Sequence, residues 1–116
     1  REYPEEFAVW CREPASMTPP GGESRPQIYK RVGNALREII RRSRGDIAIV
    51  SHGAALAYIV SLMLEKELGG HDEIIVKNVS ISTVEYKPET GRYTMVEAND
   101  VSHLKGFSQG QARVRF

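Results

Sequence analysis

The chain has 116 residues, and 41% of them are hydrophobic, which is enough apolar material for one packed core and excludes wholesale disorder. Its formal net charge is +1, from 16 basic and 15 acidic residues, which argues against a nucleic-acid or membrane partner selected by bulk charge. The single cysteine, Cys11, excludes an intrachain disulfide and indicates a reducing, cytoplasmic compartment. No apolar run approaches the roughly 20 residues of a membrane-spanning helix.

The first expected element is a short helix within residues 3–10, with Pro4 in its first turn. Phe7 and Trp10 are three residues apart and would share one face, so we expect both to anchor the helix in a core. Residues 17–22 are rich in proline and glycine and predict a surface loop.

A longer helix is expected to begin at Ser24, because Ser24 and Gln27 have the spacing of a capping box and Pro26 suits the first turn. Apolar residues then follow at helical spacing: Ile28, Val32, Ala35, Leu36, Ile39 and Ile40. The helix ends in a basic cluster, Arg41, Arg42 and Arg44, before Gly45. We interpret this cluster as a solvated end favoured by the helix dipole, in preference to a nucleic-acid contact.

The central stretch begins with four apolar residues, Ile47–Val50, which predict a parallel strand buried on both faces. A second helix is expected over residues 54–68, with Leu56, Ile59, Val60, Met63, Leu64 and Leu68 on its buried face and Gly69-Gly70 at its end. His52 therefore lies between a strand end and a helix start, where unpaired N–H groups favour anions. A histidine there can hold a phosphate, or it can merely cap the turn.

The last part of the chain predicts antiparallel structure. Residues 74–76 are a candidate short strand, interrupted by Asn78, and the alternating residues 79–87 and 92–97 form a hairpin closed by a four-residue loop, 88–91. Residues 98–116 have no regular pattern, and 105–116 are expected to be a loose tail. His71 is interpreted as a solvated loop histidine.

The order of these elements predicts an α/β fold, with a mainly parallel sheet sandwiched by helices and an antiparallel hairpin at the C-terminal end. Residues 1–116 would then form a single, partial domain.

Several common catalytic patterns are absent from the sequence. Ile49 occupies the position two before Ser51, so there is no G-x-S-x-G nucleophile elbow, and no phosphate-binding glycine loop or H-E-x-x-H motif occurs. The three histidines are far apart and the lone cysteine has no ligand partner at a metal-binding spacing. We therefore expect no metal and no cofactor.

Four segments, in this order, resemble motifs of the histidine phosphatase superfamily, the phosphoglycerate-mutase-like enzymes. Pro20-Gly21-Gly22-Glu23-Ser24, with Arg31 seven residues later, is similar to the family's P-x-G-E-S…R segment. Ile49–Gly53 resembles its second histidine motif, Asn78–Ile81 the approach to its late strand, and Asn99–Leu104 its closing N-D-x-x-H-L. The match covers roughly residues 3–104, and its specificity comes from the order and gaps of all four segments.

The resemblance implies phosphoryl transfer through a phosphohistidine, in which a first histidine of an R-H-G motif attacks phosphorus. His52 matches the second, catalytic histidine, which holds the phosphoryl group and stabilises charge in the transition state. Its substrate-binding neighbours would be Ser51, Gly53, Glu23 and Asn78. Arg31, Ser24 and His103 would be structural supports, with Arg31 paired to Glu23; direct contact of the Glu23–Arg31 pair with substrate is the alternative.

One departure from the family is large, since no R-H-G occurs in these 116 residues and the chain begins at Arg1. The family's order places that motif upstream, so we expect this chain to be a C-terminal portion that is inactive alone. Its expected partners are the missing N-terminal part of the same domain, or a second copy, and a phosphorylated small-molecule substrate, with neither nucleic acid nor membrane.

Three functions fit the sequence. The loop at residues 17–22 carries no cation, whereas mutases of the family present arginines from this loop to the carboxylate of a phosphoglycerate. This difference favours a phosphatase over a phosphoglycerate mutase. The third alternative is a non-catalytic module that binds a phosphorylated ligand or a protein.

Overall fold

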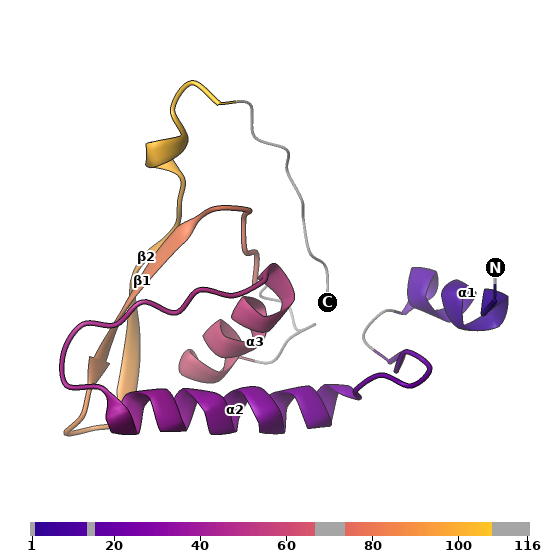
Figure 1. The fold of residues 1–116 in the computed structure, drawn as a ribbon, viewed down its shortest axis with the longest axis horizontal. Helices are drawn as coiled ribbons and strands as arrows, with labels where there is room; N and C mark the ends of the chain where they lie inside the picture. Colours follow the sequence, from indigo (N-terminus) through magenta and orange to yellow (C-terminus); the bar gives the residue numbers. More distant parts are fainter. Residues whose placement is uncertain (1, 14–15, 67–73, 108–116) are drawn as a thin grey trace.

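A computed structural model describes residues 2–13, 16–66 and 74–107 of the chain (Figure 1). The elements in chain order are helices α1 (Pro4–Arg12), α2 (Arg25–Arg42) and α3 (Gly53–Met63), strands β1 (Ile81–Lys87) and β2 (Arg92–Asp100), and a short 3-10 helix, η1 (Ser102–Leu104). His71 and the tail beyond residue 107 lie outside the described residues.

Helix α1 forms where the sequence predicts a short helix, with Pro4 in its first turn, but it does not anchor in a core. Phe7 and Trp10 are 43% and 46% exposed, and none of the helix residues is buried within the described structure. The prediction that these two aromatic side chains are core anchors is therefore wrong for this structure. The physical reason is that no other described element packs closely against α1.

Helix α2 confirms the predicted capping box at its start and the basic end at Arg41 and Arg42. Both arginines form exposed ion pairs with Glu38, one turn earlier on the same helix, at 2.9 and 2.6 Å. This local pairing, together with the dipole at the helix end, agrees with the interpretation of Arg41 and Arg42 as a solvated helix end.

The core lies between α2 and α3. Val32 of α2 and Ala57 and Tyr58 of α3 are buried together, and partly buried apolar side chains surround them: Ile28, Tyr29, Ile59, Leu62, Ile74 and Val76. The rings of Tyr29 and Tyr58 meet edge to face, with centroids 4.8 Å apart and planes 86° from parallel, an arrangement that favours aromatic pairs.

Helix α3 is shorter than predicted and buries a different face. It ends at Met63 instead of residue 68, and Glu65 just beyond adopts a left-handed backbone with φ 53°. The buried residues are Ala57, Tyr58 and Ser61, whereas the predicted large apolar residues 56, 59, 60, 63 and 64 are only half-buried. Small residues at Ala57 and Ser61 allow α2 to approach closely, so they decide which face turns inward.

The apolar run Ile47–Val50 is not paired with another strand in the described structure. Val50 is 94% exposed and Ile47 is 46% exposed, so the predicted burial on both faces is not observed here. A parallel strand needs neighbours to pair its backbone and helices to cover its faces, and the described residues provide neither at this position. The parallel sheet remains a prediction.

The C-terminal hairpin confirms the prediction, with β1 and β2 antiparallel and joined by the four-residue loop 88–91. Strand β2 extends three residues further than expected, to Asp100, and the register shifts near Thr83. Residues 74–76 form no strand; Ile74 and Val76 instead pack against the α2–α3 core. Val79 was predicted as the first residue of the strand, but it lies in a turn before β1. Its backbone there is left-handed (φ 56°).

Candidate functional site

His52 immediately precedes helix α3 at its N-cap, with extended backbone angles of φ −96° and ψ 157°. Its carbonyl oxygen accepts the first helical hydrogen bond, from the Leu56 N–H at 2.9 Å, but its side chain forms no capping bond. His52 and Ser51 are exposed, and Gly53 opens the helix. An exposed imidazole beside the unpaired N–H groups of a helix start is an arrangement suited to holding an anion.

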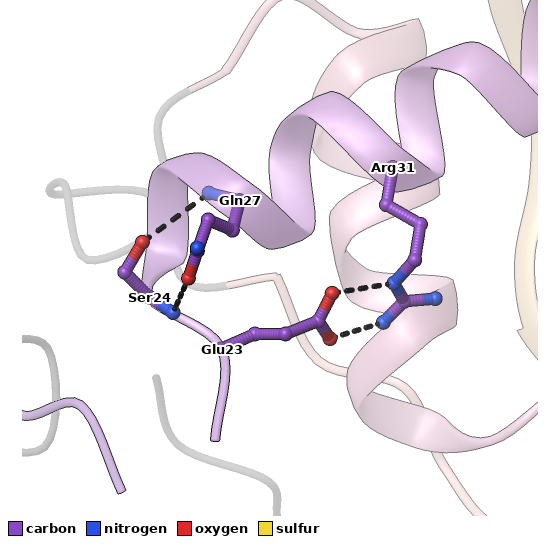
Figure 2. Close-up of polar contacts among 4 residues, drawn as sticks. All are labelled: Glu23, Ser24, Gln27 and Arg31. Atoms are coloured by element: carbon purple, nitrogen blue, oxygen red, sulfur yellow. Dashed lines mark hydrogen bonds and ion pairs between the residues drawn. The ribbon is translucent and has the colours of Figure 1, made fainter. Parts of the chain in front are cut away.

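Glu23 and Arg31 form a bidentate ion pair at the start of α2 (Figure 2). The Arg31 Nε donates to Glu23 Oε1 at 2.8 Å, and Nη2 donates to Oε2 at 2.7 Å. The hydrogen bonds from Arg31 lower the pKa of Glu23 below its ordinary value, and the pKa of Arg31 is raised in turn. The predicted partnership of these residues is therefore present, and it holds one carboxylate and one guanidinium in a fixed relative orientation.

The turn before this pair fixes where it lies. Pro20 and Gly21 (φ 71°) form the middle of a tight turn, closed by the Gly22 N–H donating to the Pro19 carbonyl oxygen at 2.8 Å. Ser24 then caps α2: its Oγ accepts from the Gln27 N–H at 3.4 Å, and its N–H donates to Gln27 Oε1 at 2.7 Å (Figure 2). The G-E-S segment is thus a turn, a paired carboxylate and a helix cap in succession.

Asn78 and Val79 are the central residues of a turn in which the Ser80 N–H donates to the Lys77 carbonyl oxygen at 3.3 Å. Asn78 is exposed, and no hydrogen bond joins its side chain to another residue in the described ranges. The turn is held by Asn99, whose side-chain oxygen accepts from the Lys77 N–H at 2.9 Å. Asn99 was predicted only as part of the N-D-x-x-H-L segment, with no role of its own. Its backbone is left-handed (φ 55°), a conformation that asparagine tolerates better than most residues.

His103 lies in η1, exposed, directly after the hairpin. Asp100 Oδ1 accepts from the Ser102 N–H at 2.8 Å and so caps this short turn. The hydrogen bonds from Ser102, with a smaller contribution from the charge of His103, lower the pKa of Asp100. The closing N-D-x-x-H-L segment therefore contains two successive residues that hold two different turns: Asn99 for the Asn78 turn and Asp100 for the His103 turn.

The predicted site residues fall into separate groups in the described structure. Glu23, Ser24 and Arg31 lie together at the start of α2, whereas no hydrogen bond or ion pair within the described residues joins them to His52. Helices α2 and α3 pack together and both run from right to left in Figure 1, so their N-terminal ends are directed toward the same side. The Tyr29 hydroxyl, near the start of α2, lies 3.0 Å from the Ser61 hydroxyl, near the end of α3, so it is not the His52 end of α3 that meets the start of α2.

A cleft lies elsewhere, between the start of α2 and the end of α3. It is lined by Arg25, Pro26, Tyr29, Ser61, Leu62, Glu65 and Lys66, none of them a predicted site residue. Within the described residues, no group of three or more histidine, cysteine, aspartate or glutamate side chains could hold a metal ion, and no helix is long and apolar enough to span a membrane.

The profile of the histidine phosphatase superfamily (branch 1) matches residues 1–100, most of the chain. The chain belongs to this superfamily. Membership makes the fold class α/β, which agrees with the helices and the hairpin of the described structure. The matched range contains the first three resembling segments and the first two residues of the fourth, Asn99 and Asp100.

Two curated relatives of the chain carry the names of different enzymes. The chain is similar to phosphoserine phosphatase 1 of Hydrogenobacter thermophilus, at 29% identity over 107 residues, covering 91% of this chain and 50% of that protein. It is also similar to the probable phosphoglycerate mutase GpmB of Salmonella paratyphi B, at 32% identity over 108 residues, covering 86% and 50%. The chain therefore spans about half the length of the curated relatives that it matches.

Proposed function

We propose that this chain is part of a phosphomonoester hydrolase that acts through a phosphohistidine intermediate, whose nucleophilic histidine lies outside these 116 residues. Three observations support the proposal: membership of the histidine phosphatase superfamily, the absence of R-H-G from the sequence, and a span of about half the relatives' length. The observation that carries it is the His52 side chain at the start of α3, which is exposed and forms no capping hydrogen bond.

In this proposal, His52 and the backbone N–H of Gly53 hold the oxygens of the phosphoryl group as it passes to and from the nucleophile. Phosphoryl transfer spreads negative charge over three equatorial oxygens, so the site needs cations and oriented N–H donors more than it needs covalent chemistry. An imidazole and backbone N–H groups are present together at the start of an 11-residue helix, whose dipole adds to the positive potential.

We assign the Glu23–Arg31 pair to the wall of the site, with Asn78 and Ser51 as further contacts to substrate and His103 as a support. The bidentate pairing supports a structural role for Arg31, because its Nε and Nη2 already donate to Glu23 at 2.8 and 2.7 Å. A guanidinium committed to a carboxylate has less capacity to bind a phosphate directly. Glu23 in turn presents a carboxylate that is ionised at neutral pH.

We favour a phosphatase over a phosphoglycerate mutase. The loop before Glu23 has no basic residue from Met17 to Gly22, and its Pro19–Gly22 turn is closed by its own backbone hydrogen bond. Such a wall lacks the charge that would retain a phosphorylated carboxylic acid for a second transfer. The relatives carry names of both kinds, so the assay must separate the two activities.

In the complete protein, we propose that residues 47–50 form a strand of a parallel sheet, paired with a segment outside this chain. The support is the apolar composition of the run and the exposure of Val50. We also propose a cytoplasmic location, on the basis of the single cysteine.

The first prediction concerns His52→Ala in the full-length protein. Removing one charge-stabilising donor from such a site costs on the order of 10²–10³ in rate, so phosphate release from a phosphomonoester should fall by that factor. His71→Ala, at a histidine that no motif includes, is the matched control. Activity of His52→Ala within twofold of the parent protein would contradict the assignment.

The same assay separates the three functions. A phosphatase releases inorganic phosphate from phosphomonoesters such as phosphoserine, whereas a mutase interconverts 2- and 3-phosphoglycerate with little release. A binding module does neither, but binds inorganic phosphate with an affinity that His52→Ala lowers. An R-H-G motif in the coding sequence upstream of Arg1 favours the enzyme, and its absence favours the binding module.

A further inference from the structure

The Lys77–Ser80 turn contains an unfavourable residue at its sharpest point. Val79 has φ 56° at the third position of the turn, where a positive φ normally requires glycine or asparagine. A β-branched side chain with a left-handed backbone is strained, at a cost on the order of 1–3 kcal/mol, and such a conformation persists only when its surroundings impose it.

The Asn99 side chain imposes this conformation from both sides of the turn. Its Oδ1 accepts from the Lys77 N–H at 2.9 Å, and its Nδ2 donates to the Ile75 carbonyl oxygen at 2.6 Å. The Ser80 hydroxyl, which has one proton, lies 2.7 Å from the Lys77 carbonyl oxygen and 3.2 Å from Asn99 Oδ1. One amide therefore contacts residues before and after Asn78, and it uses a donor and an acceptor that an isosteric carboxylate cannot both supply.

Asn99 is itself fixed to the hairpin. Its backbone N–H donates to Ser82 Oγ at 3.0 Å, and its own backbone is left-handed at the end of β2, where the register with β1 has shifted. Asn99 thus connects the hairpin to the turn that presents Asn78. Because Asn78 is exposed and makes no hydrogen bond to another described residue, its position depends on the backbone of this turn.

We infer that Asn99 is a positioning residue of the proposed phosphoryl-transfer site: it holds the strained Lys77–Ser80 turn and thereby directs the Asn78 side chain toward the substrate. This inference rests on the proposed function. It gives a physical reason for an asparagine at the end of β2, which tolerates the left-handed backbone and supplies both a donor and an acceptor.

The test uses the full-length protein and the isosteric change Asn99→Asp, which keeps the shape and the tolerated backbone but replaces the Nδ2 donor by an oxygen facing the Ile75 carbonyl. We expect kcat/KM for a phosphomonoester to fall roughly 10- to 100-fold, as for a misplaced group in a preorganised site. Asn78→Ala should lose a similar factor. The double variant should lose no more than Asn78→Ala alone, because Asn99 acts through Asn78.

Two further variants distinguish positioning from simple stability. Val79→Gly removes the strain that Asn99 opposes, so in the Asn99→Asp background it should recover part of the lost kcat/KM. Glu85→Gln, at an exposed residue of β1 opposite Thr94, is the matched control and should stay within twofold of the parent. In Asn99→Asp, repulsion between the new carboxylate oxygen and the Ile75 carbonyl oxygen should displace the side chain and weaken its bond to the Lys77 N–H. Hydrogen exchange at the Lys77 amide should therefore speed up in Asn99→Asp and not in Asn78→Ala. If Asn99→Asp does not fold, Asn99→Gly tests the same loss with a relaxed backbone.

The outcomes separate the two proposals. A parent protein that neither releases phosphate nor interconverts phosphoglycerates refutes the proposed enzyme, and the inference with it. An active parent with Asn99→Asp within twofold refutes the inference alone. So do multiplicative losses in the double variant, or a loss that Val79→Gly fails to reduce.

Discussion

Glu23 and Arg31 carry opposite charges on exposed side chains, with exposed fractions of 43% and 60%. Water and salt screen such pairs, so this one contributes little to overall stability despite its bidentate geometry. The pair matters for orientation, because two parallel hydrogen bonds between the guanidinium and the carboxylate fix both side chains relative to the start of α2. The family motif thus combines a charge pair of modest strength with a defined geometry.

The second prediction follows from the lowered pKa of Glu23. A carboxyl whose folded pKa lies below its unfolded value stabilises the fold above the unfolded value, about 4.5 here, and loses that contribution as pH falls through the folded pKa. Melting temperatures of the parent and Glu23→Gln should therefore differ slightly at pH 7 and converge in acid. The difference should shrink in 1 M salt. A gap that widens below pH 4 would contradict this pairing.

At the scale of elements, α2 depends on its N-terminal cap. The third prediction is that Ser24→Ala destabilises the full-length protein by about 0.5–2 kcal/mol, because the Gln27 N–H loses its side-chain acceptor. Ser24→Asp is the matched control, since aspartate can still accept from that N–H and suits the helix dipole. Denaturant unfolding measures both. Equal losses in the two variants would show that the hydroxyl has a role other than capping.

The packing of α2 against α3 gives a fourth prediction, at Gly33. A Cβ added there would lie 3.7 Å from Leu62 Cδ1 and 3.8 Å from an Arg37 nitrogen, which are ordinary contacts. Gly33→Ala should therefore stabilise the protein by about 0.5–1 kcal/mol, since glycine is unfavourable inside a helix. Gly33→Leu should instead destabilise it by roughly 1–3 kcal/mol through overpacking. Unfolding midpoints check both, and a destabilised Gly33→Ala would mean that the helices lie closer together.

At the scale of the whole molecule, the described structure exposes apolar residues that normally lie in a core. Helix α3 is apolar around most of its circumference, a pattern typical of a helix covered on all sides, yet only one face is buried. Val50, Val79, Ile81 and Val96 are 94%, 71%, 56% and 61% exposed. These exposed surfaces are the reason for the proposal that further layers of the fold lie outside these 116 residues.

The fifth prediction is that residues 1–116 alone release no phosphate and either self-associate or melt without cooperativity, because unpaired strand edges and exposed apolar residues recruit other chains. Sedimentation, thermal unfolding and a phosphatase assay measure this. A monomer with a sharp melt would contradict the stability part, and turnover at the parent rate would contradict the catalytic part.

Val50→Lys sharpens this fifth prediction. In the isolated chain, where Val50 is 94% exposed, the lysine should be tolerated and should reduce association. In the full-length protein it should be strongly destabilising, by several kcal/mol, if the strand is buried there. Glu89→Lys, in the exposed hairpin loop, is the control and should be harmless in both. A full-length protein that tolerates Val50→Lys would refute the buried strand.

Local signals in the sequence predicted several features well. The capping box at Ser24 and the hairpin over its four-residue loop depend on residues close in the chain, so spacing alone indicates them. The Glu23–Arg31 pair was implied by the resemblance to the family. The positions of His52 at a helix start and of Asn78 just before a strand were also predicted. Their roles in a site remain predictions, because no described contact joins them.

The sequence by itself determined the family, the helices, the hairpin and the absence of an R-H-G nucleophile, since these depend on residue identity and short-range periodicity. Only the tertiary structure decided which face of α3 is buried, because small residues at Ala57 and Ser61 permit close approach of α2 and no periodicity ranks them above leucine. It also showed the side-chain contacts of Asn99, one of which joins it to Ile75, 24 residues earlier in the chain. Such contacts depend on how distant segments meet, which composition and spacing along one chain do not specify.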